Sequence, residues 1–234
     1  MDYARSVATT LEYLEDTYKN HSTAKVLHSG SDERGPYLIL DRTVFYPQGG
    51  GQPSDTGVVR RSDSGPVDVT FVVTVGDDLR HYVRCTDSIT VGATIDLVVD
   101  IEKRLVNSKC HTAGHLIHSL LESVEPSTKV VKGYHFRDSP YVEYEGDIKS
   151  ERPALVEQLN NLLSDSIAAS LPVTVSVDPL MTYQGRCLRT VQIGDYPAIP
   201  CGGTHLRNLG EFRNILIKKI YTKQGKHRIN YSVE

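Results

Sequence analysis

Three histidines lie within eight residues of this 234-residue chain, in the segment HTAGHLIH at residues 111–118. His111 and His115 are four residues apart, so on an α-helix they lie one turn apart on the same face. Two imidazoles presented in this way are able to bind one metal ion. Helices also carry such pairs by chance, and a buried histidine often forms only hydrogen bonds. The pair therefore indicates a metal site only if further ligands join it.

A second cluster, CGGTH at residues 201–205, supplies such ligands. Cys201 and His205 flank a glycine-rich turn that follows a proline. Two imidazoles from a helix, with a thiolate and an imidazole from a turn, form a ligand set that suits Zn²⁺. No glutamate follows His111, so the general base of the HExxH peptidases is absent. We therefore expect a zinc site that acts on an activated acyl group, such as an ester.

The other cysteines and the third histidine are expected to be structural. His118 follows the second histidine of the pair by three residues and is expected to lie in the core or to support a ligand. Cys110 precedes the first histidine, points about 100° away from it on a helix and is expected to pack. Cys85 and Cys187 lie in or beside strand-like segments and are interpreted as small apolar side chains.

The glycine-rich segment TVFYPQGGGQPSDTG, residues 43–57, is a third candidate. Three consecutive glycines allow a backbone to approach a ligand closely. A hairpin turn is the plainer explanation of the glycines alone. However, a turn does not require Phe45 and Tyr46 before it, or Gln52 and Asp55 after it. The segment is therefore a candidate binding loop.

The elements that must position these residues fall into two groups. Residues 10–18 predict a short helix or a lead-in strand. Six short segments rich in Val, Ile, Leu and Tyr then alternate with turns, which predicts a small barrel or a sandwich. These segments are 24–29, 35–42, 57–61, 67–75, 80–85 and 94–101. We expect a β-rich first domain at residues 1–100.

The pattern changes near residue 100. Apolar residues at helical spacing predict helices at 101–124 and 152–171. Strand-like segments follow them, at 129–136, 141–147, 172–178, 188–193, 211–223 and 227–233. Two helices among mixed strands predict an α+β layer structure for a second domain, residues 101–234.

The composition limits the class of protein. With 39% hydrophobic and 24% charged residues, the chain is typical of globular proteins. It has no run of eighteen apolar residues, so no membrane span is expected. Four cysteines, and a start unlike a signal peptide, predict a reducing compartment, with the cytoplasm as the default.

The net charge of −3 is unevenly distributed. Residues 1–100 carry 9 basic and 15 acidic side chains, whereas residues 201–234 carry 7 basic and 2 acidic ones. The basic end indicates a polyanionic partner, although a solvated basic face explains the charge equally well.

The three motifs together resemble those of the free-standing alanyl-tRNA editing proteins (the AlaX family, medium-length form with a glycine-rich motif). They are also similar to the editing domain of alanyl-tRNA synthetase. The similarity runs from about residue 14 to the C-terminus, with LEDTY, KGYHF and KQGKHRINY as supporting pieces. The resemblance implies a deacylase acting on tRNA(Ala) mischarged with serine or glycine. Neither a membrane nor DNA is an expected partner. It also implies an elongation-factor-like barrel followed by a two-layer editing domain of the threonyl/alanyl-tRNA synthetase type.

The resemblance also implies site residues. It places zinc on His111, His115, Cys201 and His205. It places the amino-acid pocket on the two glycine-rich segments, with these residues: Gly49, Gly50, Gly51, Gln52, Asp55, Gly202, Gly203 and Thr204. An editing site must reject correctly attached alanine, and Gln52 is expected to supply a polar contact that serine satisfies and alanine does not. Some relatives sense serine with a threonine hydroxyl, which has no clear equivalent around residues 129–136, and this leaves the choice between serine and glycine open.

Two alternative functions remain open, and one basic surface is a candidate for contact with tRNA. The alternatives are editing of Ser-tRNA(Thr), and a non-catalytic tRNA-binding module whose zinc is structural. The glycine-rich segment and CGGTH favour the alanine branch. Phosphate contacts are expected at the densest basic stretch, whose members are Lys218, Lys219, Lys223, Lys226 and Arg228. A strand edge protected by lysines is the other explanation of that stretch.

Overall fold

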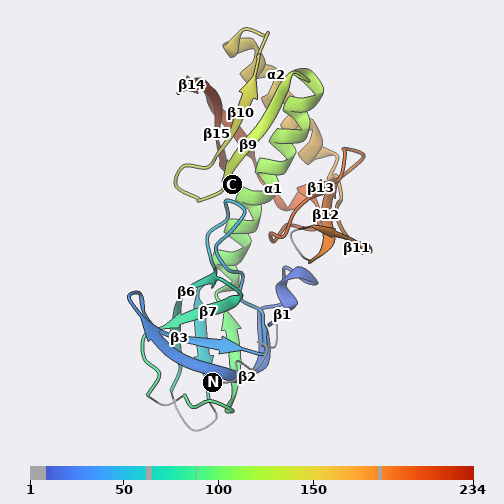
Figure 1. Ribbon diagram of the computed structural model, residues 1–234. Coiled ribbons are helices and arrows are strands. Elements are labelled where there is room, and N and C mark those ends of the chain that lie inside the picture. The colour runs from blue at the N-terminus through green and yellow to red at the C-terminus, as the bar shows by residue number, and fades with distance from the viewer. Residues whose placement is uncertain (1–8, 62–64, 88, 184–185) are drawn as a thin grey trace. The chain divides into compact units, whose positions relative to one another are not determined.

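The computed structural model describes residues 9–61, 65–87, 89–183 and 186–234, and the chain folds into two compact units (Figure 1). The first unit comprises Met1–Gly49 and Pro53–Leu105, and the second comprises Gly50–Gln52 and Val106–Glu234. The division falls inside the long helix α1 (Ile101–Val124). Helices and strands together confirm the mixed α+β class.

A closed six-stranded barrel forms the first unit, with the strand order β2-β3-β7-β6-β5-β8. Neighbouring strands pair antiparallel. The strands are β2 (His21–Asp32), β3 (Gly35–Leu40), β5 (Gly57–Arg60), β6 (Val67–Val75), β7 (Asp78–Val83) and β8 (Thr94–Val99). Of the two alternatives for this region, the barrel is therefore confirmed and the sandwich is wrong.

The barrel core follows from the period of two along its strands. Ala24 and Val26 of β2, and Ile95 and Leu97 of β8, are buried while the residues between them are more exposed. Such alternation directs one face of each strand inward. The lead-in region contains both predicted forms: β1 (Thr10–Leu11), which pairs with β4 (Arg42–Thr43), and the 3₁₀ helix η1 (Glu12–Leu14).

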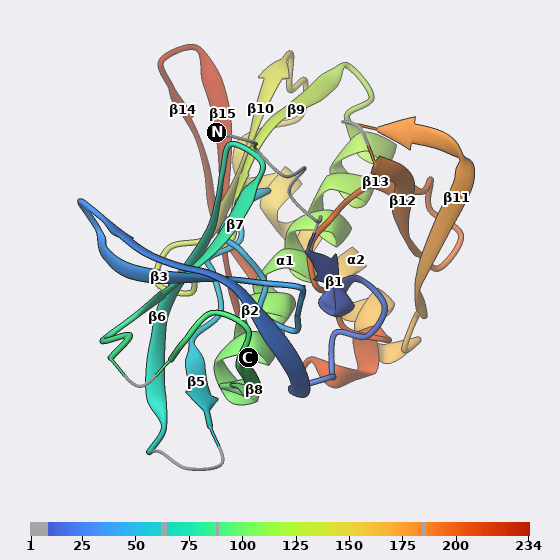
Figure 2. The same ribbon diagram turned by 60° about the horizontal axis from the view of Figure 1, so that its bottom comes forward.

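The second unit contains a four-stranded antiparallel sheet in the order β14-β15-β10-β9. Its strands are β14 (Ile215–Lys223), β15 (Lys226–Val233), β10 (Tyr141–Gly146) and β9 (Thr128–Tyr134). Helices α1 and α2 (Arg152–Ala168) lie on the same side of this sheet (Figure 2). The Tyr231 hydroxyl donates to the Cys110 carbonyl of α1 at 2.8 Å, and Asn160 of α2 bonds to the main chain of Ile217. The helices therefore cover the face that carries the buried residues of the sheet.

A three-stranded antiparallel sheet completes the second unit. It consists of β11 (Val173–Tyr183), β12 (Arg186–Ile193) and β13 (Ile199–Pro200), and the short helix η2 (Leu209–Glu211) follows. The CGGTH turn begins directly after β13. This small sheet therefore fixes where the turn starts.

Several predicted element limits and one interpretation need correction. The second helix ends at Ala168 rather than residue 171, because Ser170 has a left-handed φ of 48° that ends helical hydrogen bonding. The strand predicted over 211–223 begins at Ile215, since residue 211 ends η2 and residues 212–214 form an irregular segment with a bend. The strand predicted over 80–85 stops at residue 83. Cys85 and Cys187 are exposed and do not pack as apolar side chains, whereas Cys110 is buried as expected.

Helix α1 has the predicted limits of 101–124. Asp100 accepts a hydrogen bond from the Lys103 N–H at 3.1 Å, which caps its first turn, and Pro126 follows its end. No helix in the described part of the chain has both the length and the apolar character needed to cross a bilayer.

Candidate metal centre

The four side chains predicted to bind metal lie together in the second unit. His111 and His115 lie one turn apart on α1, while Cys201 and His205 belong to the turn that follows β13. One potential ligand atom of each lies within 4.8 Å of the other three. The fold thus brings His111 together with Cys201, which is 90 residues away in the chain.

The spacing of these atoms fits a tetrahedral metal ion. The Cys201 Sγ lies 3.6 Å from Nε2 of His111 and 3.2 Å from Nε2 of His205. Ordinary Zn–S and Zn–N bond lengths at a tetrahedral angle place S and N about 3.6 Å apart. Three imidazoles and one thiol are also a donor set that Zn²⁺ accepts. The group is therefore able to hold a metal ion in both geometry and chemistry.

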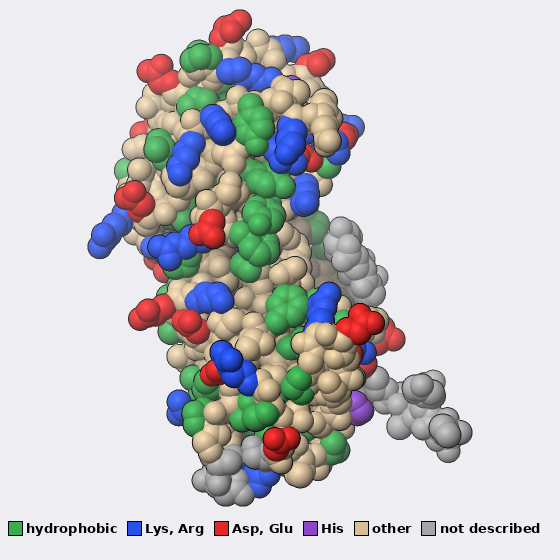
Figure 3. Space-filling view, turned by 90° about the vertical axis from the view of Figure 1, so that its left-hand side faces the viewer, with side chains coloured by type: hydrophobic (Ala, Val, Ile, Leu, Met, Phe, Trp, Pro, Cys, Tyr) green, Lys and Arg blue, Asp and Glu red, His purple; other side chains and the backbone are tan. Residues whose placement is uncertain are grey.

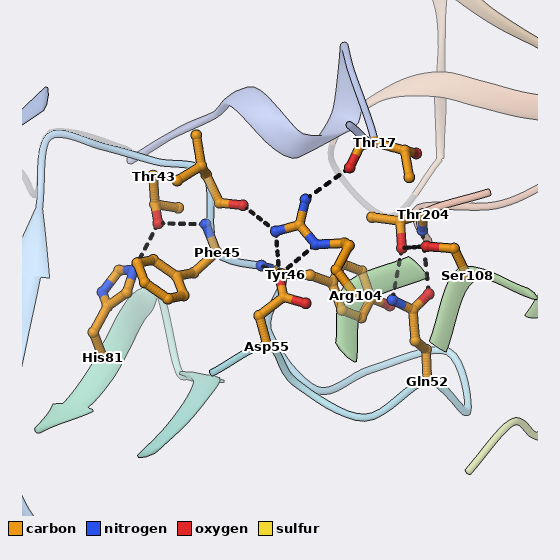
Figure 4. Close-up of polar contacts among 11 residues, drawn as sticks. Thr17, Thr43, Phe45, Tyr46, Gln52, Asp55, His81, Arg104, Ser108 and Thr204 are labelled. Carbon is orange, nitrogen blue, oxygen red and sulfur yellow. Dashed lines mark hydrogen bonds and ion pairs between the residues drawn. The ribbon is translucent and has the colours of Figure 1, made fainter. Parts of the chain in front are cut away.

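Gln52 fixes the ring of His111. The Gln52 Nε2 donates to Thr204 Oγ1 at 2.8 Å, and its Oε1 accepts from the Thr204 N–H at 3.2 Å (Figure 4). The same Oε1 lies 2.7 Å from Nδ1 of His111. Because a carbonyl oxygen only accepts, Nδ1 of His111 carries the proton, and Nε2 presents its lone pair toward Cys201. This is the support that metal-binding histidines usually receive.

The other two histidines are held differently. Oγ1 of Thr112 accepts from the Leu206 N–H and lies 3.1 Å from Nδ1 of His205, which supports that ring. Nδ1 of His115 is buried and has no hydrogen-bond partner among the described residues. The His115 ring instead packs edge-on against the His205 ring, with 4.7 Å between centroids. Hydrogen bonds therefore orient two of the three imidazoles, and packing orients the third.

Burial keeps the imidazoles of the cluster uncharged. Desolvation, assisted by neighbouring imidazoles, lowers the pKa of His111 and His205 well below the usual value and that of His115 to about 3. Burial also raises the pKa of the Cys201 thiol. Neutral imidazoles have the lone pairs that a metal requires, whereas the thiol must lose its proton. Metal binding should therefore release a proton and weaken in acid.

Most of the predicted substrate-binding residues belong to the second unit, together with the metal cluster: Gly50, Gly51, Gln52, Gly202, Gly203 and Thr204. Gly203 is required by packing, since a Cβ there would lie 2.2 Å from Cε1 of His111. Gly51 has a φ of +79°, and a Cβ there would lie 2.3 Å from the Gly133 carbonyl oxygen. The glycines thus allow the chain to approach His111 and β9 closely.

Asp55 and Gly49 belong to the first unit. Asp55 is only 1% exposed, and its Oδ2 accepts bonds from the buried Arg104 guanidinium and from the Tyr46 N–H (Figure 4). Arg104 also donates to the carbonyl oxygens of Thr17 and Val44. Burial raises the pKa of Asp55, and Arg104 opposes that rise. Asp55 therefore ties the glycine-rich segment to the start of α1, and its contact with substrate stays a prediction.

The five basic residues predicted to contact tRNA lie on two adjacent strands of the sheet. Three of them are exposed on β14: Lys218, Lys219 and Lys223. The other two, on β15, form ion pairs: Lys226 with Glu145 at 3.3 Å and Arg228 with Glu143 at 2.5 Å. The three lysines of β14 are therefore the stronger candidates for phosphate contacts.

His135 is the residue that the sequence motifs did not single out. Its ring stacks on that of His111, with centroids 4.5 Å apart and 21° between the ring planes. Burial lowers its pKa to about 4. In the sequence it appears only as part of KGYHF. The one available signal was a glycine inside the predicted helix, Gly114, which nothing local explained.

Two family models match parts of the chain. Residues 3–103 match the model described as tRNA synthetases class II (A). Residues 188–230 match the threonyl and alanyl tRNA synthetase second additional domain. The first match covers most of the barrel unit, and the second begins in β12 and runs through the CGGTH turn into β15.

Similar proteins cover almost the whole chain. An alanine–tRNA ligase from Pyrobaculum calidifontis is 35% identical over 89% of this chain and 25% of its own length. The alanyl-tRNA editing protein AlaX-L of Pyrococcus horikoshii is 28% identical over 90% of this chain and 54% of its own length. AlaX-M of Methanosarcina acetivorans is 27% identical over 95% of this chain and 98% of its own length. The chain thus spans a quarter to a half of the first two relatives and nearly all of the third.

Proposed function

We propose that this chain belongs to the family of the alanyl-tRNA editing proteins, to which it is similar, and that it deacylates mischarged tRNA(Ala). The substrates would be the seryl and glycyl esters of this tRNA. The observation that supports the proposal is a meeting of three segments in the second unit. Gln52 of the glycine-rich segment bonds both to His111 of α1 and to Thr204 of the CGGTH turn. Residues of the three motifs that carry the family resemblance are therefore in direct contact, which supports a shared site.

We assign an elongation-factor-like barrel to residues 1–100 and a two-layer editing domain to residues 101–234. We place the protein in the cytoplasm, where aminoacyl-tRNA is used. Such a protein would contribute to the fidelity of translation, because it removes amino acids that a synthetase pocket sized for alanine discriminates poorly.

The proposed cofactor is zinc, held by His111, His115, Cys201 and His205. If a coordination position opened to substrate or water, a zinc ion held there would polarise an ester carbonyl or lower the pKa of the water toward neutrality. The protein's contribution is orientation and desolvation. The Gln52 carbonyl keeps the His111 proton on Nδ1, and Gly203 leaves room for that ring. Burial keeps the imidazoles neutral, so their lone pairs are available at neutral pH.

Gln52 is also proposed to contact the amino acid. One of its two Nε2 N–H groups bonds to Thr204. The second is able to donate to a seryl hydroxyl, which a methyl group does not accept. Gln52 would then both orient the His111 ring and favour a seryl over an alanyl substrate.

The open face of the four-stranded sheet is the proposed surface for tRNA. Lys219 and Tyr221 of β14 lie on this face beside Arg228, because Tyr221 pairs with Arg228 in the sheet register. The Arg228 guanidinium covers the ring of Tyr141, which stacks on Tyr134 with 5.2 Å between centroids. In the upper part of Figure 3, Lys and Arg side chains surround a run of hydrophobic side chains. Basic groups beside aromatic rings are a common combination at nucleic-acid surfaces.

The test is hydrolysis of Ser-, Gly- and Ala-tRNA(Ala) by the purified chain, with zinc content measured in the same sample. We expect release of serine or glycine while alanine is spared. The Cys201→Ala variant should lose both zinc and activity, whereas Cys187→Ala, an exposed cysteine outside the cluster, should keep both. Failure of the wild-type chain to cleave any of the three esters would contradict the proposal.

A non-catalytic tRNA-binding module is the second candidate, because four protein donors gather at the cluster and structural zinc sites are usually closed in this way. Chelation separates the two candidates. If the zinc is structural, its removal should unfold the second unit. If it serves catalysis, chelation should abolish turnover before the circular dichroism spectrum changes. Ser-tRNA(Thr), included in the same assay, tests the related editing reaction.

A further inference from the structure

We propose that Nε2 of His135 accepts a hydrogen bond from the side-chain hydroxyl of a seryl ester bound beside the metal cluster. This inference rests on the proposed function and deepens it, since it names an acceptor for the seryl hydroxyl in addition to the donor proposed on Gln52. His135 would thus be a specificity-determining residue, although it is not one of the four predicted metal ligands.

His135 is placed against the cluster by the fold. Its side chain is 4% exposed, and its ring stacks on His111 with a centroid distance of 4.5 Å. Its main-chain N–H donates to the Gly51 carbonyl oxygen at 2.8 Å. The residue therefore joins the glycine-rich segment to the end of β9, within the second unit.

The proton of the His135 ring is fixed on Nδ1. The Tyr231 hydroxyl donates its single proton to the Cys110 carbonyl oxygen at 2.8 Å. The same hydroxyl oxygen lies 2.8 Å from Nδ1 of His135, so it must accept the Nδ1 proton there. A neutral imidazole that carries its proton on Nδ1 has a bare lone pair on Nε2. Among the described residues, the side-chain hydrogen bond of His135 is the one at Nδ1, and Nε2 makes none.

Three glycines make room for this ring. A Cβ on Gly114 of α1 would lie 2.3 Å from Cε1 of His135, and one on Gly133 of β9 would lie 2.3 Å from Nε2. A Cβ on Gly51 would lie 3.2 Å from Cδ2. Gly114 weakens the middle of a helix relative to alanine. Glycines from three separate segments therefore leave the space that the His135 imidazole occupies. This indicates that the fold is adapted to hold the ring at this position.

The unpaired acceptor explains the choice of amino acid. A phenyl ring would stack on His111 equally well, so stacking alone does not require an imidazole. A seryl hydroxyl satisfies Nε2, whereas an alanyl methyl would bury it without a partner, which is unfavourable. Sites that pair a substrate hydroxyl reject analogues that lack it. A glycyl ester has no side-chain hydroxyl, so its hydrolysis should not depend on the hydrogen bond to Nε2 of His135.

The test compares His135→Phe and Tyr231→Phe with the wild-type chain. The first variant keeps the ring stacking and removes Nε2, and the second removes the acceptor that holds the proton on Nδ1. We expect kcat/KM for Ser-tRNA(Ala), divided by that for Gly-tRNA(Ala), to fall about tenfold or more in His135→Phe and less in Tyr231→Phe. His28→Phe, on β2 of the barrel, is the control with an unchanged ratio.

Two readouts separate this role from a purely structural one. Long-range ¹H–¹⁵N NMR spectra of the wild-type chain should show His135 protonated on Nδ1. Adding 3′-seryl-amino-3′-deoxyadenosine, but not the alanyl amide, should shift its Nε2 resonance. A selectivity ratio unchanged in His135→Phe, or a ring protonated on Nε2, would overturn the inference while the proposed function stands. A wild-type chain that cleaves no ester would overturn both.

Discussion

Gln52 shows how a single buried amide is able to determine the state of a neighbouring ring. Its Oε1 accepts from both the Thr204 N–H and Nδ1 of His111, and its Nε2 donates to the Thr204 hydroxyl. Nδ1 of His111 is therefore engaged, and Nε2 is the nitrogen left to face Cys201. Removal of the amide would free the ring to rotate and to exchange tautomers.

We expect Gln52→Ala to weaken zinc binding about 10- to 100-fold, the usual effect of losing such a support. Competition with a chromophoric chelator measures it. Gln52→Glu keeps an oxygen acceptor for His111 and should lose less affinity. If Gln52 also contacts the amino acid, Gln52→Ala should reduce the preference for seryl over alanyl ester. Unchanged zinc affinity in Gln52→Ala would refute its support of His111, and an unchanged preference would refute the substrate contact.

Asp55 and Arg104 are a buried pair of the first unit, and the loss of one partner leaves an uncompensated charge. Asp55→Ala should lower the free energy of unfolding by about 3–5 kcal/mol. Urea denaturation of the full chain measures the change. Asp68→Ala is the matched control, because Asp68 forms an exposed ion pair with Arg84 on the same barrel and its loss should have little effect. Equal effects of the two substitutions would mean that burial does not decide the strength of the Asp55 pair.

Helix α1 has a sequence that is determined partly by helix-forming rules and partly by what packs on the helix. Residues 101–124 have helical spacing and a capping aspartate before them, so the helix is predictable from local rules. Gly114 is the exception, since glycine is a poor helix former. Its reason lies outside the helix, in the His135 ring that occupies the space of a Cβ.

Gly114→Ala therefore distinguishes helix propensity from packing by the sign of its effect. Propensity alone predicts a gain of about 1 kcal/mol in stability. The 2.3 Å approach of the new Cβ to the His135 ring predicts a loss instead. Urea denaturation of the metal-free chain gives the sign, and Glu122→Ala, at an exposed position of α1, is the control. A more stable Gly114→Ala chain would contradict the packing argument.

The exposed lysines of β14 give a prediction for the sheet. Replacement of Lys218, Lys219 and Lys223 by glutamine should weaken tRNA binding. It should also reduce the slope of log K against log salt by roughly 0.7–0.9 for each phosphate that the protein no longer neutralises. Filter binding at several salt concentrations measures both quantities. Lys25→Gln on β2 is the exposed control. If affinity and slope do not change, the lysines serve only to protect the strand edge.

Several histidines of the described residues are buried and neutral, and their burial makes the stability of the chain depend on pH. Burial lowers the pKa of His81, in the barrel, to about 4, while Thr43 Oγ1 lies 2.8 Å from its Nε2. An unfolded histidine titrates near 6.5, so between about pH 6.5 and 4 the unfolded chain binds more protons than the folded chain. Stability must therefore decrease as the pH falls through this window.

For His81 alone the loss is on the order of 3 kcal/mol between pH 6.5 and 4. Urea midpoints of the metal-free chain from pH 7 to 4 should fall, and His81→Gln should reduce the slope. Exposed His21→Gln is the control with the wild-type slope. A pH-independent midpoint would show that His81 is not held neutral in the folded state.

The sequence alone determined whatever depends on local periodicity and on residue type. The helix at 101–124, most of the barrel strands and the identity of four candidate ligands follow from spacing and chemistry within short segments. Tertiary structure decided what depends on contacts between distant segments. It closed the strands into a barrel, brought His111 within reach of Cys201, engaged Gln52 with His111 and Thr204, and stacked His135 on His111. These outcomes are set by packing among residues far apart in the chain, and no local pattern encodes which of those residues will meet.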